Sequence, residues 1–350
     1  MTDAIVVGGG QSGLAAAHAL RRRGLQPIVL EAGPEPVGSW PSYYDSLTLF
    51  SPARYSALPG LPFPGDPDHH PRRDEVVDYL RGYAKTLDVE VRTHHRVTTV
   101  ASDGPRLVVH TDTGAVFTTP VLIAATGGFG HPHRPALSGL DTFPGAVLHA
   151  ADYRDPTPLT GQRVIVVGGG NSAVQIATEL AAHARVSLAT RRPPRFVAQR
   201  PFGRDLHFWL NTTGFDRLPV GRWVHHPPTA PVLDTGTYQA ALAAGKPDSR
   251  PLFTHLDGTK VVWPDGTREH VDTLILATGY QPDLDYLRPL GALSATGNPL
   301  HRQGISTTHP GLGYLGLDWQ RTPASATLRG VGRDAHRLIP QLSRQPARQP

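Results

Sequence analysis

The chain has 350 residues, 39% of them hydrophobic, which predicts roughly two globular domains. Its charge of +5 comes mainly from arginines scattered without a basic run, which argues against nucleic-acid binding. The absence of cysteine excludes disulfide scaffolds, thiolate metal sites, iron–sulfur clusters and cysteine-based catalysis. No apolar run approaches the ~18 residues that would span a membrane and no cleavable leader is visible, so we expect a cytoplasmic protein without a membrane partner.

A first nucleotide signature opens the chain. A strand predicted over residues 4–7 runs into Gly8, Gly10 and Gly13, in the G-x-G-x-x-G pattern, and a helix predicted over 14–23 follows. The helix N-terminus offers free N–H groups to a pyrophosphate, and a second strand over 27–30 ends at an acid that suits ribose hydroxyls. We therefore predict FAD or NAD on a first set of residues: Gly8, Gly10, Gln11, Ser12, Gly13, Glu31 and Ala32.

A second signature repeats the first. A strand over 163–167 leads to a G-x-G-x-x-A turn, a helix through residue 180 and a strand over 186–190. Glu31 lies 23 residues after Gly8, and Arg191 lies 23 residues after Gly168. Because a guanidinium can pair with a 2′-phosphate, we predict NADPH here; the alternative is that the arginines are solvated loop charges. The predicted NADPH residues are Gly168, Gly170, Asn171, Ser172, Ala173, Arg191 and Arg192.

Both halves also close alike. Each ends in a hairpin and an apolar strand that finishes Ala-Thr-Gly, which places Thr126, Gly127, Thr278 and Gly279 near the nucleotides. We predict an α/β fold with two Rossmann-like dinucleotide-binding domains, the NADPH domain being inserted into the FAD domain. Residues 1–154 and 280–350 would form the FAD domain and residues 155–279 the NADPH domain.

A specific motif then carries a family resemblance. Residues 143–153 read FPGAVLHAADY and match the pattern F-x-G-x-x-x-H-x-x-x-(Y/F), by which the chain resembles the flavin-containing monooxygenases, in particular small bacterial members. Gly38-Ser39-Trp40 and residues 44–52 fall where that family borders the flavin. Residues 309–319 resemble its third flavin segment, which implies Asp318 near the ribityl chain, followed by a helix over 324–328 that begins at Ala324.

The resemblance also implies an activity. Members use FAD, NADPH and dioxygen to oxygenate an amine or sulfide, or a ketone by Baeyer–Villiger insertion, through a flavin hydroperoxide. The pair Tyr153-Arg154 is nearer the N- and S-oxygenating branch, and the resemblance implies that His149 and Tyr153 support the catalytic site by positioning. Animal members carry an Asn near the flavin that residues 50–52 lack, so Ser51 or Asn171 is expected to supply that polar contact. The alternatives are a non-oxygenating NADPH:acceptor oxidoreductase and a flavoprotein that binds without turnover.

The remaining sequence features either predict no specific function or allow more than one. Histidine pairs at 69–70, 94–95 and 225–226 are not expected to hold a metal, because neighbours on a strand point to opposite faces. The aromatic, proline-rich stretch 196–231 predicts a lid or substrate wall, or else core packing or a homodimer interface. The tail 343–350 is predicted to fray.

Overall fold

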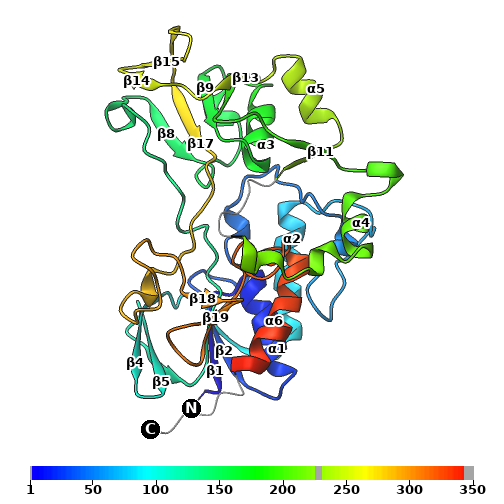
Figure 1. Cartoon of the computed structure of the whole chain (residues 1–350), viewed down its shortest axis with the longest axis vertical. Coiled ribbons are helices and arrows are strands. Elements are labelled where there is room, and N and C mark those ends of the chain that lie inside the picture. The colour runs from blue at the N-terminus through cyan, green and yellow to red at the C-terminus, as the bar shows by residue number, and fades with distance from the viewer. Residues whose placement is uncertain (1, 225–230, 343–350) are drawn as a thin grey trace.

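A computed structural model describes residues 2–224 and 231–342, which form two units stacked along the long axis (Figure 1). The histidine pair at 225–226 and the tail 343–350 lie outside the described residues. Within these ranges no helix is both long and apolar enough to cross a membrane. Besides the elements given below, the described chain has eight short 3-10 turns: η1 (Trp40–Ser42), η2 (Ala53–Tyr55), η3 (Leu140–Thr142), η4 (Thr157–Leu159), η5 (Pro201–Gly203), η6 (Phe215–Arg217), η7 (Val220–Trp223) and η8 (Asp285–Leu287).

The lower unit of Figure 1 is built on a seven-stranded sheet with the order β18-β19-β20-β7-β1-β2-β3. Its strands are β1 (Ala4–Val7), β2 (Pro27–Leu30), β3 (Glu90–Arg92), β7 (Leu122–Ala124), β18 (His301–Arg302), β19 (Ile305–Ser306) and β20 (Leu312–Tyr314). Successive side chains of β1 alternate between the two faces. Ala4 and Val6 pack with the helices α1 (Gln11–Arg21), α2 (Arg73–Thr86) and α6 (Leu328–Leu342). Ile5 and Val7 pack on the opposite face with the antiparallel sheet β4 (Val97–Asp103), β5 (Arg106–Thr111) and β6 (Val116–Thr119).

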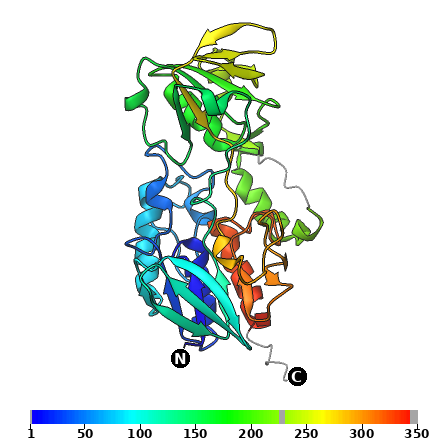
Figure 2. The same cartoon turned by 90° about the vertical axis from the view of Figure 1, so that its left-hand side faces the viewer.

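The upper unit repeats this layout. Its five-stranded parallel sheet has the order β13-β10-β9-β17-β8, with strands β8 (Ala146–His149), β9 (Arg163–Val167), β10 (Arg185–Thr190), β13 (Asp248–Pro251) and β17 (Thr273–Leu276). Val164 and Val166 of β9 face α3 (Asn171–Leu180) and α5 (Thr237–Ala243), whereas Ile165 and Val167 face the antiparallel sheet β14 (His255–Asp257), β15 (Lys260–Val262) and β16 (Arg268–His270). Figure 2 shows this second antiparallel sheet at the top of the molecule. The predicted fold, with two Rossmann-like units, is confirmed.

Two details differ from the sequence-based expectations. β8 pairs in parallel with β17, so residues 146–149 belong to the sheet of the upper unit, although the motif around them was assigned to the first domain. The helix predicted over 324–328 was wrong, because α6 begins only at Leu328. The side-chain oxygens of Thr322 and Ser325 bond backbone N–H groups of this stretch instead, and so compete with helix formation.

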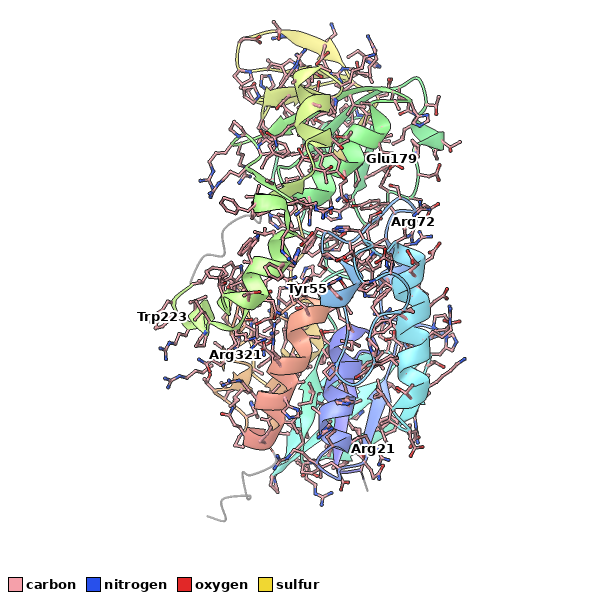
Figure 3. All side chains as sticks on the ribbon, turned by 90° about the vertical axis from the view of Figure 1, so that its right-hand side faces the viewer. Arg21, Tyr55, Arg72, Glu179, Trp223 and Arg321 are labelled. Atoms are coloured by element: carbon pink, nitrogen blue, oxygen red, sulfur yellow. The ribbon has the colours of Figure 1, made fainter. Side chains whose placement is uncertain are left out.

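The stretch 196–231 runs from the upper unit onto the lower one. It contains β11 (Phe196–Ala198), which pairs with β12 (Val232–Asp234), and the helix α4 (Leu206–Thr212). Gln199 Nε2 donates to the carbonyl of Phe50 at 3.1 Å, and the carboxylate of Asp216 pairs with Arg329 at 2.8 Å. Figure 3 shows Trp223 near Arg321 at the side of the lower unit. The stretch therefore bridges the two units; its action as a lid or wall stays a prediction.

Candidate active site

The first glycine turn follows β1 and starts α1. Gly8 has φ +101°, and a Cβ on Gly13 would lie only 1.7 Å from the Gly8 carbonyl oxygen, so glycine is required for strand and helix to pack this closely. Gln11 donates through Nε2 to the Ala326 carbonyl at 2.7 Å, whereas its Oε1 is buried and has no partner in the described part of the chain. A ribose or ribityl hydroxyl would satisfy that acceptor, so the turn fits FAD.

The acid at the end of β2 is held against this turn. Glu31 is only 7% exposed, and its two oxygens accept the N–H groups of Gly9 at 2.5 Å and of Gly33 at 2.7 Å. Ala32 continues the chain between these contacts. Backbone hydrogen bonds of this kind fix the orientation of a carboxylate. The carboxylate therefore lies beside the turn, where a nucleotide ribose would pass.

Two further segments pack directly on the first turn. A Cβ on Gly38 would lie 2.8 Å from Gly10 Cα, which places Ser39 and Trp40 beside the turn. A Cβ on Gly316 would lie 2.2 Å from Ser12 Oγ, so the loop that leads to Asp318 rests on the start of α1. These close approaches bring two of the segments that the resemblance assigned to the flavin, residues 38–40 and 309–319, onto the first turn.

The carboxyl of Asp318 has an unusual setting. Its side chain is accessible to solvent, yet the protein around it raises its pKa above the ordinary value by desolvation. Burial also raises the pKa of Tyr43 to about 12, and the charge of Asp318 adds to this effect. Both groups therefore hold their protons more firmly than they would in water. Ala324 is buried and lies in a turn before α6, not at a helix N-terminus aimed at a ligand.

The second glycine turn follows β9 and starts α3. Gly168 has φ +145°, and a Cβ there would lie 2.3 Å from the Ala277 carbonyl oxygen. Gly170 differs, because a Cβ on it would meet no atom within 4 Å. Its open side leaves room for a phosphate at the N-terminus of α3, where Ser172 and Ala173 form the first turn. The arrangement fits a dinucleotide.

The arginines at the end of β10 flank this second turn. Arg191 and Arg192 are exposed, and a Cβ on Gly169 would lie 3.6 Å from the Arg192 carbonyl oxygen. Neither guanidinium makes an ion pair or hydrogen bond within residues 2–224 and 231–342. Both remain available for an anionic group. The side chain of Asn171 already has partners within the protein: it accepts a hydrogen bond from the N–H of Leu233 at 3.4 Å and donates one to the Pro231 carbonyl at 3.3 Å.

The chain passes between the two units just after Gly127 and again just after Gly279, and these two crossings are hydrogen-bonded to each other. Thr126 Oγ1 donates to the Asp283 carbonyl at 2.6 Å, and Thr278 Oγ1 donates to the His133 carbonyl at 2.5 Å. The His133 N–H also donates to the Gly279 carbonyl at 2.9 Å. Gly127 and Gly279 have φ of +67° and +87°. The paired crossings thus begin where the central strands of both sheets end.

His149 lies at this junction and is completely buried. Its Nε2 lies 3.1 Å from the Gly279 carbonyl, and the N–H of Ala151 donates to its Nδ1 at 3.1 Å. These partners suit the neutral imidazole with the proton on Nε2, and burial lowers the pKa of the ring. Both ring nitrogens are occupied, so His149 holds the crossing in place and is not free for proton transfer.

The side chains of Tyr153 and Ser51 also form hydrogen bonds to other side chains of the protein. Tyr153 is 2% exposed, and its hydroxyl donates to Glu179 Oε2 on α3 at 2.8 Å. Ser51 Oγ lies 2.8 Å from Ser56 Oγ in the lower unit. In the described ranges, no hydrogen bond joins any two of the four side chains predicted as catalytic, His149, Tyr153, Ser51 and Asn171.

An aromatic series at the junction was missed by the sequence reasoning. The rings of Trp40 and Tyr43 lie 5.5 Å apart, Tyr43 and Phe129 4.7 Å, and Phe129 and Tyr280 5.4 Å. The rings of His149 and Tyr280 lie 5.1 Å apart in a T-shaped arrangement. The series starts beside the first turn and ends at the second crossing. A signal was present, because Phe129 and Tyr280 follow the two Ala-Thr-Gly motifs by two residues and one residue.

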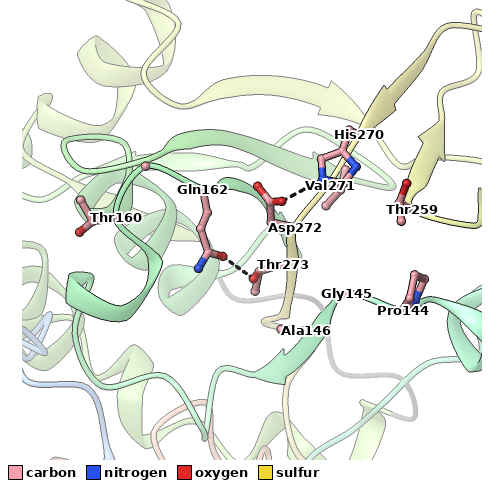
Figure 4. A pocket seen from close by; sticks show the side chains of 11 residues that line it. Pro144, Gly145, Ala146, Thr160, Gln162, Thr259, His270, Val271, Asp272 and Thr273 are labelled. Carbon is pink, nitrogen blue, oxygen red and sulfur yellow. Dashed lines mark hydrogen bonds and ion pairs between the residues drawn. The ribbon is translucent and has the colours of Figure 1, made fainter.

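A surface depression on the upper unit lies away from this site (Figure 4). It is lined by the amino ends of β8, β9 and β17, whereas the glycine turns follow the carboxyl ends of such strands. Its polar groups pair with each other: Thr273 Oγ1 donates to Gln162 Oε1 at 2.7 Å, and His270 lies 2.9 Å from Asp272. We assign it no role. No group of three or more potential metal ligands occurs among the described residues.

Comparison with known proteins agrees with this geometry. Residues 5–218 match the family model of pyridine nucleotide-disulphide oxidoreductases. The solved structure of a flavin-containing monooxygenase from Stenotrophomonas maltophilia is 33% identical, covers 98% of both chains and has a TM-score of 0.86. An indole-3-pyruvate monooxygenase, YUCCA1, of Oryza sativa is 31% identical over 87% of this chain and 81% of its own.

A shorter relative matches nearly end to end. An oxidoreductase described as CzcO-like, from Geobacillus kaustophilus, is 29% identical over 97% of both chains. This match extends over nearly the whole length of both chains. The chain therefore belongs to the flavin-containing monooxygenase family, within the wider pyridine nucleotide-disulphide oxidoreductase family, and is an oxidoreductase that uses FAD and NAD(P)H.

Proposed function

We propose that this protein is an NADPH-dependent monooxygenase that oxygenates a soft nucleophile, an amine or a sulfide. One observation supports this most strongly: both glycine turns open beside the paired crossings, so two nucleotides would meet at the aromatic series. When bound, FAD supplies the redox chemistry, taking two electrons from NADPH and activating dioxygen, one atom of which goes to the substrate and the other to water.

The first turn and its neighbours would hold the FAD. Gly8 and Gly13 shape the turn, Gln11 Oε1 offers an acceptor, and Glu31 takes the ribose hydroxyls. Gly170, Ser172 and the exposed Arg191 and Arg192 would hold NADPH. We assign the preference for NADPH over NADH to the two arginines, because a carboxylate at the same place would repel the 2′-phosphate.

The junction residues set the environment of the reaction. Half-buried rings of Trp40, Tyr43, Phe129 and Tyr280 exclude water from their side of the site. Burial raises the pKa of both tyrosines, so each hydroxyl remains a hydrogen-bond donor at neutral pH. Desolvation raises the pKa of the Asp318 carboxyl above its ordinary value beside this wall.

An isotope experiment tests the proposal. Purified holoprotein is incubated with NADPH, ¹⁸O₂ and a panel of one tertiary amine, one thioether, one ketone and indole-3-pyruvate. We expect one ¹⁸O atom in the amine or thioether product and one NADPH consumed per product. Label entering the ketone or the 2-oxo acid alone would assign a different substrate class. NADPH oxidation that yields only hydrogen peroxide, or reduction of an added quinone without label transfer, would make the chain a non-oxygenating acceptor oxidoreductase. A cysteine-dependent disulfide reductase is excluded by the sequence.

A further inference from the structure

We infer that Tyr44 is an interdomain positioning residue, which fixes the NADPH-binding helix α3 relative to the flavin side of the junction. The inference rests on the proposed roles of the two glycine turns. Tyr44 belongs by sequence to the lower unit, four residues after Trp40. Its side chain, however, is 2% exposed and is part of the hydrophobic core of the upper unit.

The hydroxyl of Tyr44 reaches α3 itself. It donates to Oε1 of Gln175, and the hydroxyl of Tyr153 donates to Glu179, one helical turn further on. The two tyrosine rings lie 6.2 Å apart. Burial raises the pKa of both hydroxyls, so both remain protonated donors. Gln175 lies only three residues after Ser172, on the same helix as the phosphate-binding turn.

The backbone around Tyr44 is fixed to the lower unit and to the linker. The carbonyl of Tyr43 accepts from Arg73 of α2 at 2.8 Å and from Arg154 at 3.1 Å. The N–H of Asp45 donates to the Arg154 carbonyl at 2.9 Å. The backbone on both sides of Tyr44 is thus fixed to α2 and to Arg154, whereas its ring and hydroxyl contact the upper unit and α3. A shift at either end is transmitted to the other, which couples the position of NADPH to the flavin wall at Tyr43.

A role in packing alone would be met by phenylalanine, which keeps the ring and removes only the hydroxyl. The matched control is Tyr83→Phe, because Tyr83 is 1% exposed and its hydroxyl donates to the Pro59 carbonyl at 2.7 Å entirely within the lower unit. Both substitutions remove one buried hydrogen bond at similar cost to folding. Only Tyr44→Phe removes one between the two units.

The first measurement is flavin reduction, followed anaerobically by stopped-flow as NADPH is varied. For holoprotein Tyr44→Phe we expect the limiting rate to fall roughly tenfold, because donor and acceptor are misplaced. FAD content and apparent NADPH affinity should change by less than about twofold, and Tyr83→Phe should match the wild type. Gln175→Leu should reproduce the effect, and the double variant should add nothing, as expected for two partners in one contact.

The second measurement is hydrogen–deuterium exchange of the holoprotein without NADPH. Amides of residues 171–180 should exchange faster in Tyr44→Phe than in the wild type or in Tyr83→Phe. Unchanged exchange and an unchanged limiting rate would overturn the inference, and so would a slower rate fully explained by lost FAD. A wild type that is reduced but transfers no labelled oxygen would refute the proposed function alone, because both measurements end before oxygen is admitted.

Discussion

Gly170→Ala separates nucleotide binding from folding. Gly170 has φ −93° and ψ −175°, which alanine adopts without strain, and the added methyl would meet no atom within 4 Å. Loss of backbone freedom in the unfolded chain stabilises by about 0.4–1 kcal/mol. The weaker helix start of alanine costs a similar amount, so we expect little change in thermal stability.

The effect on binding should be large by comparison. If a pyrophosphate approaches the open side of Gly170, the methyl displaces it from the N–H groups at the start of α3. A hydrogen bond to a charged group is worth about 1.5–3 kcal/mol, which corresponds to a rise in the Kd of NADP⁺ of roughly ten- to 150-fold. We would measure this Kd by calorimetric titration of the FAD-loaded protein with NADP⁺ and follow thermal unfolding in parallel.

The control is Gly82→Ala on α2, where an added Cβ also meets no atom within 4 Å. It is remote from both turns and should leave NADP⁺ binding and FAD content unchanged, while the unfolding temperature rises slightly because alanine is the better residue inside a helix. Equal affinities for Gly170→Ala and the wild type would refute the reasoning, because they would show that no phosphate lies against this glycine. A fall in FAD content for Gly170→Ala alone would instead show that the second turn serves the flavin.

Four further outcomes are expected. Gly13→Ala, with its methyl 1.7 Å from a backbone oxygen, should yield protein without FAD and with a lower unfolding temperature; normal flavin content would contradict the close packing. Arg191→Glu should raise the KM for NADPH roughly tenfold or more and leave that for NADH nearly unchanged, and an equal effect on both coenzymes would remove its phosphate role. Burial lowers the pKa of His149 in the native state, so the stability that this residue confers is present above pH ~6.5 and falls as the pH drops below that value. His149→Gln should therefore flatten this part of the profile of unfolding temperature against pH. Identical profiles for the variant and the wild type would argue against this role of His149. Asp334→Ala removes the ion-pair partner of the buried Arg321, which lies 2.7 Å from it, and should lower the free energy of unfolding by about 3–5 kcal/mol in denaturant titrations. A loss below about 1 kcal/mol would show that water reaches the site.

The glycine turns could be predicted because their signal is local. The chain must turn sharply at Gly8 and Gly168 after a strand, and Gly13 must lie close to the strand before it. All of these requirements concern residues within about thirteen positions of one another in the sequence. The alternation of β1 between its two faces was equally local. Such features depend on neighbours in the chain and not on the rest of the fold.

The junction could not be predicted in the same way, because its partners are distant in sequence. Tyr44 and Gln175 are separated by 131 residues, and His149 and Gly279 by 130. Their contacts depend on how the two units are placed, which no local pattern records. The failed helix over 324–328 has another cause, since the hydroxyls of Thr322 and Ser325 offer the backbone partners that a composition rich in alanine conceals.

The internal repeat itself explains why the aromatic series forms where it does. In each unit the central sheet carries the nucleotide turn and the Ala-Thr-Gly motif at the same edge, since β1 and β7 are parallel neighbours, as are β9 and β17. A chain that leaves one unit after this motif must pass the nucleotide edge of that unit, and it does so twice. Phe129 and Tyr280 therefore meet because they leave equivalent places in the two repeats, and Tyr43 joins them from the segment packed on the first turn. The same duplication that supplies two glycine turns thus also brings these aromatic rings together at the junction.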